Sequence, residues 1–511
     1  MRPTERRATA TPPDGAHTPP SDLIVVSNRQ PYRHTRTDGE LTIDEPTGGL
    51  TAGLDPVLQE TGGTWIAWGD GDGDWDVTDE QDCIRVPPHE SDQYTLRRLK
   101  LEQAAIDGYY TGYSNRVLWP LCHEMGSLLD VREGDLEWYR SVNRSFAEAV
   151  IDHATAESVI WLQDYHLALA PQIIRESVSA TGGATIGQFW HIPWPTPEVF
   201  GACPNARELL EGLLGNDVLG FHVPSYGANF LSCVETFLSG ATVEYQSKTV
   251  EYDGNRTRVV STPMGVNADR YHTQALEAPD TQWEDFCAAY GIPPNSSLGL
   301  GVDRLDYAKG IPERLTALEH LFETAPSWRE SFTFIQKATP SRTDIPAYEH
   351  LGEHVRERVS EINDRFGTEN WQPIVYTEDI LEQSTLAAMY READMLVVSS
   401  IKDGMNLVAQ EYVASSLGNE GALVLSDRTG AADVLGYPAY TIDPTDTERF
   451  AQTLETALTA PQSERRSRMA ALRDHAFDHD LEWWMHQQFG HLNAAHNSTP
   501  PQTTSNPFQS E

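Results

Sequence analysis

A short apolar run that ends in a polar loop recurs through the sequence, and this pattern constrains the fold more than any other feature. It first appears at residues 23–29, Leu-Ile-Val-Val-Ser-Asn-Arg, and returns at 158–161, 184–190 and 217–221 with helical segments between. Continuous apolar runs are typical of buried strands in parallel α/β sheets, where the polar residues after each strand meet at one edge. The chain is therefore predicted to be an α/β protein with a ligand crevice at that edge.

The series stops near residue 266 and a second one follows. Its runs lie at residues 297–302, 331–336, 373–376, 394–398, 421–425 and 439–442. Two such series in 511 residues predict two α/β domains that face each other across a crevice. The predicted divisions are a first domain at 21–266, a second at 267–480, a closing helix at 481–495, and disordered tails, rich in Thr and Pro, at 1–20 and 496–511.

Charge is strongly unbalanced, with 37 Lys and Arg against 76 Asp and Glu and a formal net charge of -39. This field repels nucleic acid and anionic membranes, so neither is expected as a partner, and a solvated acidic surface of this kind fits a halophilic protein. No run approaches the roughly 20 apolar residues of a membrane span. The 5 cysteines form no C-x-x-C pair, which favours a reducing cytoplasm over a disulfide framework or zinc site.

The segment at residues 303–310, Asp-Arg-Leu-Asp-Tyr-Ala-Lys-Gly, follows the first strand of the second series. Arg304 and Lys309 place two cations beside a glycine at the end of a buried strand. Fixed positive charge at such a place is what an anionic leaving group such as a diphosphate requires. The alternative is an ordinary surface loop whose cations pair with Asp303 and Asp306.

A second motif, Lys-Asp-Gly-Met-Asn-Leu-Val-Ala-Gln-Glu at residues 402–411, lies between a strand and a helical stretch. Asp403 and Gly404 are expected to turn the chain and Asn406 to cap the helix, so that its first N–H groups point into the crevice. Such a helix start can hold a phosphate or a ribose, with Glu411 one turn on to accept hydroxyl hydrogen bonds. Plain capping is the alternative, and the two are compatible.

Polar residues also follow the strands of the first series. Arg29, Asp164, His191 and His222 stand at predicted carboxyl ends. A lone histidine on a strand is usually a core residue, but several polar residues at successive strand ends favour one shared crevice.

Three further features are weak alone. Gly48 and Gly49 can bring backbone amides to a phosphate or form a common turn, and the aromatic residues around Tyr110 and Trp119 can wall a sugar site or fill a core. The acidic stretch at 70–81 lacks the Gly and Glu of a calcium loop and the preceding apolar strand of a phosphatase motif. It is interpreted as a solvated loop.

Taken together, these motifs resemble the ordered motif set of the trehalose-6-phosphate synthase family, retaining glycosyltransferase family 20. The resemblance covers residues 24 to about 430 and rests on Val-Ser-Asn-Arg29, Gly48-Gly49-Leu, Tyr-Tyr110, Val-Leu-Trp119-Pro, Gln-Asp164-Tyr-His, His191-Ile-Pro-x-Pro-Thr-Pro-Glu, Asp-Arg304-Leu-Asp-Tyr-x-Lys309-Gly, Pro-Ser-Arg342 and Asp403-Gly-Met-Asn-Leu-Val-Ala-x-Glu411.

The resemblance implies a GT-B fold of two Rossmann-like domains. It implies transfer of glucose, with retention, from a nucleotide-glucose, usually UDP-glucose, to glucose 6-phosphate. In the front-face mechanism usually assigned to the family, the departing phosphate oxygen takes the acceptor's proton and no carboxylate forms a covalent intermediate. No cofactor or metal is expected, and a homo-oligomer stays open.

The resemblance also implies residue roles. The expected acceptor-binding residues are Arg29, Tyr110, Trp119, Asp164 and Arg342, with Arg29 and Arg342 on the phosphate. The expected donor-binding residues are Gly48, Gly49, Arg304, Lys309, Asp403, Asn406, Leu407, Val408, Ala409, Gln410 and Glu411. The expected catalytic residues are Arg304, Lys309, His191 and Asp164.

The sequence departs from the family's motif at two positions. Gln410 replaces a familiar lysine and Lys402 stands where arginine is frequent, so the donor base is less constrained than its sugar. A related enzyme with another phosphorylated acceptor, such as a glucosylglycerol-phosphate synthase, and a catalytically silent sugar-phosphate sensor are the alternatives. The joint presence of Arg304, Lys309, Asp403 and Glu411 counts against the sensor.

No phosphatase domain is recognised after residue 490, so the product is expected to leave phosphorylated.

Overall fold

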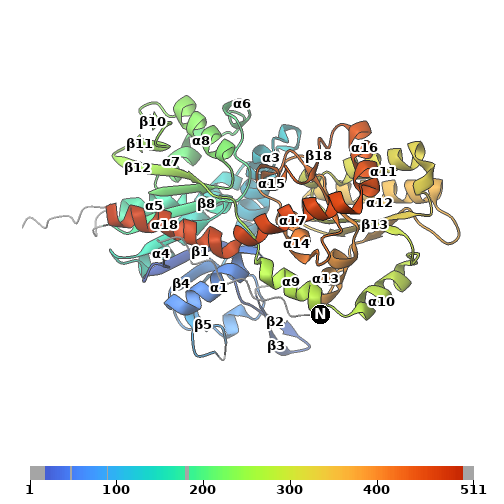
Figure 1. Cartoon of the computed structure of the whole chain (residues 1–511). Coiled ribbons are helices and arrows are strands. Elements are labelled where there is room, and N and C mark those ends of the chain that lie inside the picture. The colour runs from blue at the N-terminus through green and yellow to red at the C-terminus, as the bar shows by residue number, and fades with distance from the viewer. Residues whose placement is uncertain (1–17, 46–48, 89, 179–182, 499–511) are drawn as a thin grey trace, which may run out of the picture.

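Two sheets, one in each half of the chain, organise the computed structural model (Figure 1). The structure describes residues 18–45, 49–88, 90–178 and 183–498. Within these residues, a 10-stranded sheet has the order β10-β11-β12-β9-β8-β7-β1-β4-β6-β5. Its strands are β1 (Leu23–Arg29), β4 (Thr64–Trp68), β5 (Cys83–Val86), β6 (Tyr94–Leu99), β7 (Val159–Gln163), β8 (Thr185–Trp190), β9 (Val218–Phe221), β10 (Thr242–Glu244), β11 (Thr249–Tyr252) and β12 (Asn255–Ser261).

The second sheet has 6 parallel strands in the order β15-β14-β13-β16-β17-β18. They are β13 (Ser297–Arg304), β14 (Phe332–Thr339), β15 (Ile374–Thr377), β16 (Met395–Val398), β17 (Ala422–Ser426) and β18 (Tyr440–Ile442). All six predicted strands of this half are confirmed. Because the chain order reverses between β13 and β16, this sheet has a topological switch point there, where α/β proteins bind ligands.

The first sheet has the same kind of switch point between β1 and β7. The predicted strands β1, β7, β8 and β9 are confirmed. The sequence did not predict β4 to β6, β10 to β12, or the two-stranded hairpin of β2 (Arg33–Thr37) and β3 (Glu40–Asp44). The hairpin strands carry polar side chains and β3 is exposed throughout, so they lack the apolar run that identified the buried strands.

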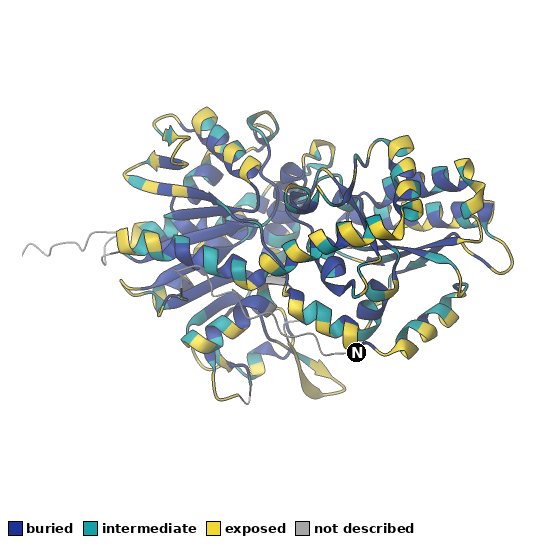
Figure 2. Cartoon of the chain, viewed as in Figure 1, coloured by how far each residue is buried: buried dark blue, intermediate teal, exposed yellow. Residues whose placement is uncertain are grey.

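Helices cover the faces of the sheets, with their buried sides inward (Figure 2). They are α1 (Gly49–Thr61), α2 (Gln103–Ala105), α3 (Trp119–Cys122), α4 (Asp135–His153), α5 (Ala170–Val178), α6 (Pro197–Phe200), α7 (Ala206–Leu213), α8 (Pro224–Phe237), α9 (Ala268–Glu277), α10 (Asp280–Tyr290), α11 (Ile311–Thr324), α12 (Pro346–Phe366), α13 (Gln383–Glu392), α14 (Leu407–Ser415), α15 (Gly430–Leu435), α16 (Thr447–Thr459), α17 (Gln462–Asp478) and α18 (Leu481–Ser498). Among the described residues, none of these helices is long and apolar enough to cross a membrane.

The last helix, α18, returns from the second half of the chain to the first sheet (Figure 1). Its Trp484 ring centroid lies 5.5 Å from that of Trp161 and 5.0 Å from that of Phe189. The predicted start of the C-terminal tail at residue 496 is wrong, because α18 continues to Ser498 and His496 Nδ1 lies 3.0 Å from Thr185 Oγ1. The remaining tail residues, 1–17 and 499–511, lie outside the described residues.

The interpretation of residues 70–81 as a solvated loop is wrong for Asp74, which is completely buried. Its Oδ1 accepts a hydrogen bond from the His34 amide at 2.8 Å and lies 3.2 Å from Arg98 Nη2. A buried carboxylate with these partners belongs to the interior, whereas the composition of the loop indicated only its exposed side chains.

Candidate active site

The carboxyl ends of β13 and β16 meet at the switch point of the second sheet. Gly310, which follows Lys309, has a φ of 62°, and a Cβ atom there would lie 2.1 Å from the carbonyl oxygen of Ser399 after β16. The Ser399 hydroxyl in turn donates to the Gly310 carbonyl at 2.8 Å. Only glycine tolerates both the left-handed backbone and the close approach, so Gly310 fixes the two loops against each other.

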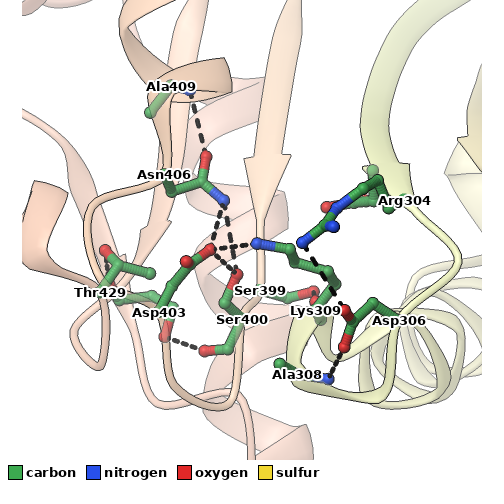
Figure 3. A network of polar contacts seen from close by, with 12 residues as sticks. Arg304, Asp306, Ala308, Lys309, Ser399, Ser400, Asp403, Asn406, Ala409 and Thr429 are labelled. Carbon is green, nitrogen blue, oxygen red and sulfur yellow. Dashed lines mark hydrogen bonds and ion pairs between the residues drawn. The ribbon is translucent and has the colours of Figure 1, made fainter. Parts of the chain in front are cut away.

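Lys309 and Asp403 form an ion pair across these two loops (Figure 3). Lys309 Nζ lies 2.5 Å from Asp403 Oδ2, which also accepts from Asn406 Nδ2 at 3.1 Å and from the Ser400 hydroxyl at 3.2 Å. Burial would raise the pKa of Asp403, but Lys309, with His123 and the Asn406 amide, lowers it to about 2. Asp403 is therefore a carboxylate that orients Lys309.

Asp306 joins the other cations of the loop and is completely buried. Its Oδ2 lies 3.3 Å from Arg342 Nη1 and 3.7 Å from Arg304 Nη2. Burial opposes ionisation, yet Arg342, Arg304 and Lys309 together hold the pKa of Asp306 below its usual range. Asp306 thus holds cations from two loops at one place.

The alternative prediction is a loop whose cations pair with its own Asp303 and Asp306. It is confirmed for Arg304, which pairs with Asp306, but it is wrong for Asp303. The carboxylate of Asp303 instead lies 2.6 Å from Nη1 of the buried Arg314. The Arg304 side chain keeps 38% of its surface exposed, so its pairing with Asp306 leaves it open to the crevice.

The predicted helix start at Asn406 is confirmed. Asn406 caps α14, and its side-chain oxygen accepts from the Ala409 amide at 3.3 Å. The cap uses one amide of the first turn and leaves those of Leu407 and Val408 without a partner inside the helix. These two amides can receive an anion.

Two side chains further along α14 already have protein partners. Glu411 Oε2 accepts from the Tyr390 hydroxyl at 2.9 Å, and burial raises the pKa of Glu411 despite that bond. Gln410 is buried and donates to the Met264 carbonyl at 3.0 Å. Met264 lies in the connection between the domains, so the Gln410 side chain contacts that connection.

The first sheet places a cavity of about 270 Å³ at its own switch point. It lies where β1, β7 and β8 end and where α1 begins. The first residue of α1 is Gly49, one of the two glycines predicted to bind the donor. Gly48 lies outside the described residues. The cavity is lined by Ser27, Asn28, Arg29, Thr51, Gln163, Asp164, His166 and His191.

Asp164 follows β7 in a left-handed conformation with a φ of 69°. Its Oδ1 accepts from the amides of Tyr165 at 2.9 Å and His191 at 3.3 Å. Burial raises the pKa of Asp164 from 3.8 to about 6, although these amides and the nearby arginines oppose the shift. The group can therefore change its charge in the physiological range.

This shift predicts that Asp164→Asn stabilises the protein at neutral pH. Folding disfavours the Asp164 carboxylate, so the stability linked to this group is present below its unfolded pKa of 3.8 and is lost as the pH rises through about 6. Asparagine stays neutral, and its Oδ1 can keep both amide bonds. We expect a gain of roughly 1–3 kcal/mol at pH 8 that disappears toward pH 4, measured by urea unfolding. An equal gain at both pH values would contradict the assigned shift.

His191 follows β8, and its Nε2 lies 3.0 Å from Gln163 Oε1. Burial, with His222 nearby, lowers the pKa of His191 well below its usual value, so the ring is neutral. A Cβ atom on Gly404 would lie 2.1 Å from the His191 carbonyl, which brings the turn after Asp403 directly against the first domain. The predicted His191 position is thus at the junction of the two halves.

His222 is not among the residues that line this cavity. It is buried, its ring lies 5.5 Å from that of His191, and its Nδ1 accepts from the Met264 amide at 3.4 Å. Strand register alone could not distinguish a residue that lines the cavity from one behind it.

Arg342 crosses the cleft between the domains. Its guanidinium lies 4.0 Å from the ring centroid of Trp119, donates to the Tyr348 hydroxyl at 2.6 Å and reaches the Tyr165 hydroxyl at 3.3 Å. The Arg304 guanidinium lies 5.2 Å from the same Trp119 ring. Trp119 therefore supports two cations, a role different from a sugar-facing wall.

Tyr110 completes this group from the π-helical segment Ile106–Leu118. Burial would raise its pKa, but the pKa of Tyr110 is lowered because Arg342 and Arg29 both lie against its hydroxyl. Its ring stacks on that of His166 at 5.7 Å. Arg29, Tyr110 and Arg342 are therefore brought together from three distant parts of the sequence.

The sequence predicts no role for Tyr165, His166 and Tyr348, and it indicates Asp306 only as a partner for the cations of its own loop. Tyr165 and His166 directly follow Asp164, so their position after a strand was a usable signal. Tyr348 lies in α12 and nothing in its local sequence distinguishes it from a core tyrosine.

Comparison with known proteins agrees with this geometry. A family model described as Glycosyltransferase family 20 matches residues 21–494. The α,α-trehalose-phosphate synthase (UDP-forming) of Schizosaccharomyces pombe is 33% identical over 498 residues, which span 95% of this chain and 93% of that protein.

Two solved structures are similar over nearly their whole length. An α,α-trehalose-phosphate synthase (UDP-forming) from Burkholderia xenovorans in complex with glucose-6-phosphate has a TM-score of 0.81 and 32% identity, covering 92% of this chain and 100% of that one. A trehalose-6-phosphate structure from E. coli bound with UDP-2-fluoro glucose has a TM-score of 0.82 and 31% identity, covering 92% and 98%.

These likenesses confirm the predicted GT-B fold and the prediction of a glycosyltransferase. Because the family model matches nearly all of the described chain and relatives at this identity are covered almost end to end, the chain belongs to glycosyltransferase family 20.

Proposed function

We propose that the protein transfers glucose from UDP-glucose to glucose 6-phosphate, giving trehalose 6-phosphate and UDP. The observation that carries this proposal is the arrangement of cations at two facing switch points. Arg304 ends β13 and Lys309 follows it on one side, and Arg29 lies beside the cavity on the other. Arg342 connects the two, because it pairs with Asp306 beside Arg304 and lies with Arg29 against Tyr110. Cations on both sides of the cleft suit a donor diphosphate and an acceptor phosphate.

On the donor side, Arg304 and Lys309 neutralise the charge that grows on the diphosphate as the glycosidic bond breaks. Lys309 is held by Asp403 at 2.5 Å in this structure, so it is aligned before the donor arrives. The amides of Leu407 and Val408 at the start of α14 add hydrogen bonds that cost no reorganisation during the reaction.

On the acceptor side, Arg29 and Arg342 bind the phosphate of glucose 6-phosphate. Asp164, which lines the 270 Å³ cavity, accepts a hydrogen bond from a hydroxyl of the same sugar. The relative from Burkholderia xenovorans in complex with glucose-6-phosphate supports this choice of acceptor.

Two carboxylates of the site are already paired with cations, which supports transfer without a covalent enzyme intermediate. Asp403 is bound by Lys309, and Asp306 by Arg342 and Arg304. We propose that the departing phosphate oxygen takes the acceptor's proton on the face from which it leaves, so that the configuration at the sugar carbon is retained. Paired acid and base carboxylates are not needed for this route.

A panel of nucleotide-glucose donors and acceptors tests the proposal. Glucose 6-phosphate with UDP-glucose is expected to give the highest kcat/KM in low or high salt. A higher value with glycerol 3-phosphate would favour a glucosylglycerol-phosphate synthase, and binding of sugar phosphate with no turnover for any donor would favour the sensor.

Activity is expected without added divalent metal. The cationic side chains of Arg304 and Lys309 supply the positive charge that a metal ion provides in other phosphate-transferring sites. Activity after dialysis against EDTA should equal that with added Mg²⁺. Loss of activity in EDTA that Mg²⁺ or Mn²⁺ restores would contradict this prediction.

A further inference from the structure

One residue of the acidic loop at residues 70–76 forms an ion pair with a strand of the first sheet, and the proposed reaction does not use this pair. Asp74 and Arg98, from β6, are both completely buried, with Arg98 Nη2 3.2 Å from Asp74 Oδ1. A buried ion pair adds little net stability, because the loss of hydration offsets the attraction. Its presence therefore points to a role in fixing one particular arrangement of the chain.

Arg98 joins segments that are distant in sequence. Its Nε donates to Gln30 Oε1 at 2.9 Å and its Nη1 to the Asp74 carbonyl at 2.9 Å. Its Nη2 donates to the Tyr32 carbonyl at 3.0 Å and lies 2.7 Å from His34 Nδ1. One guanidinium thus holds the end of β1, the start of the β2–β3 hairpin and the acidic loop together.

Asp74 binds the same segments from the other side. Its Oδ2 accepts from Gln30 Nε2 at 2.6 Å and from the Gly71 amide at 2.8 Å, while its Oδ1 accepts from the His34 amide at 2.8 Å. The Gln30 side chain therefore donates to Asp74 and accepts from Arg98, so it is held by both members of the ion pair.

Gln30 immediately follows Arg29, the cation proposed to bind the acceptor phosphate. The pairing of β1 with β4 shifts register between Ser27 and Arg29, and Arg29, the last residue of β1, pairs with Trp68. The Arg29 carbonyl accepts from the Ser27 hydroxyl at 2.6 Å, which itself accepts from Trp65 Nε1 at 2.8 Å. Side-chain hydrogen bonds thus hold the backbone on both sides of Arg29.

Arg29 differs from the other cations of the cleft. Lys309, Arg304 and Arg342 each have a carboxylate within 4.0 Å, whereas the described residues provide none for the exposed Arg29. The side chain of Arg29 lies against the neutral Tyr110 hydroxyl, and the network around Gln30 constrains the backbone that carries it.

We propose that Asp74 and Arg98 are positioning residues that act through Gln30 to set Arg29 for the acceptor phosphate. This inference rests on the proposed function, since it concerns recognition of the phosphate group on glucose 6-phosphate. It gives the acidic loop a role in acceptor specificity and none in donor binding.

Three variants separate this role from general stability. Asp74→Asn removes the buried charge, and Gln30→Ala removes the link to β1 while the ion pair stays. Asp76→Asn is the matched control, because Asp76 lies on the same turn and pairs with hairpin residue Arg36 at 2.8 Å, with both side chains exposed. The first two are expected to raise the KM for glucose 6-phosphate about tenfold and leave the KM for UDP-glucose within about twofold, whereas the control changes neither.

A double-mutant cycle with Arg29→Ala provides the decisive readout. If Asp74 acts through Arg29, Asp74→Asn should add less than about a twofold further increase in KM for glucose 6-phosphate in the Arg29→Ala background. Additive effects, an equal rise in the KM for UDP-glucose, or an unchanged KM in Gln30→Ala would overturn the inference. If Asp74→Asn does not fold, the cycle is run with Gln30→Ala and read the same way.

The activity of the wild-type protein shows whether a negative result contradicts the positioning role or the proposed function. If wild type makes no trehalose 6-phosphate, the function is wrong. The cycle is then read from the affinity of each variant for glucose 6-phosphate, measured by calorimetry without turnover, with the same expected coupling. If wild type is active and the effects are additive, only the positioning role is wrong.

Discussion

Arg304→Ala is expected to lower kcat by a factor of about 100 or more while the protein remains folded. Arg304 is 38% exposed at the switch point of the second sheet, and its guanidinium faces a crevice in which negative charge grows on the leaving diphosphate. A contact that strengthens in the transition state changes kcat, whereas one equally strong in the ground state changes KM alone. Initial rates at saturating UDP-glucose and glucose 6-phosphate measure this difference.

The matched control is Arg356→Ala in α12. Arg356 is also exposed and pairs at 2.7 Å with Glu378, which follows β15, two strands from the switch point between β13 and β16. We expect its kcat within about twofold of wild type, since exposed ion pairs contribute little. If Arg304→Ala keeps the wild-type kcat, Arg304 does not stabilise the leaving group.

Arg342→Ala is expected to raise the KM for glucose 6-phosphate by roughly 30- to 100-fold, the effect of losing about 2–2.7 kcal/mol of charge-assisted hydrogen bonding. Its guanidinium lies 4.0 Å from the Trp119 ring and reaches Tyr165 across the cleft, so it also helps to close the acceptor site. Steady-state kinetics with varied glucose 6-phosphate measure the change.

Unphosphorylated glucose is the control substrate for this variant. Wild type is expected to use glucose poorly, and Arg342→Ala should lower that residual activity much less than the activity with glucose 6-phosphate. An equal loss with both acceptors would show that Arg342 does not recognise the phosphate. Arg342→Lys should restore binding only in part, because lysine cannot donate to Tyr348 and to the phosphate in one plane.

Local sequence patterns are sufficient to predict a structural feature that is determined within a single helix or strand. The start of α14 could be predicted because Asn406 is a cap residue between a strand and a helical stretch. The six strands of the second sheet could be predicted because each is a buried parallel strand, whose apolar run is continuous.

Other features depend on contacts between distant segments, which a single sequence does not reveal. Asp306 brings together Arg304 and Arg342, yet its own neighbours in sequence indicate only a charged loop. Asp74 was assigned to solvent because acidic residues surround it, although Arg98 and His34 enclose it. Burial of a charged residue follows from partners that fold against it, and those partners lie outside the local pattern.

The central claim is that one crevice transfers glucose with retention onto glucose 6-phosphate. Nuclear magnetic resonance of the purified product from UDP-glucose and glucose 6-phosphate tests it most directly. We expect a phosphorylated non-reducing disaccharide in which both anomeric carbons are α, formed in equal amounts with UDP. A β configuration at the transferred glucose, or release of free glucose in place of a disaccharide, would contradict it.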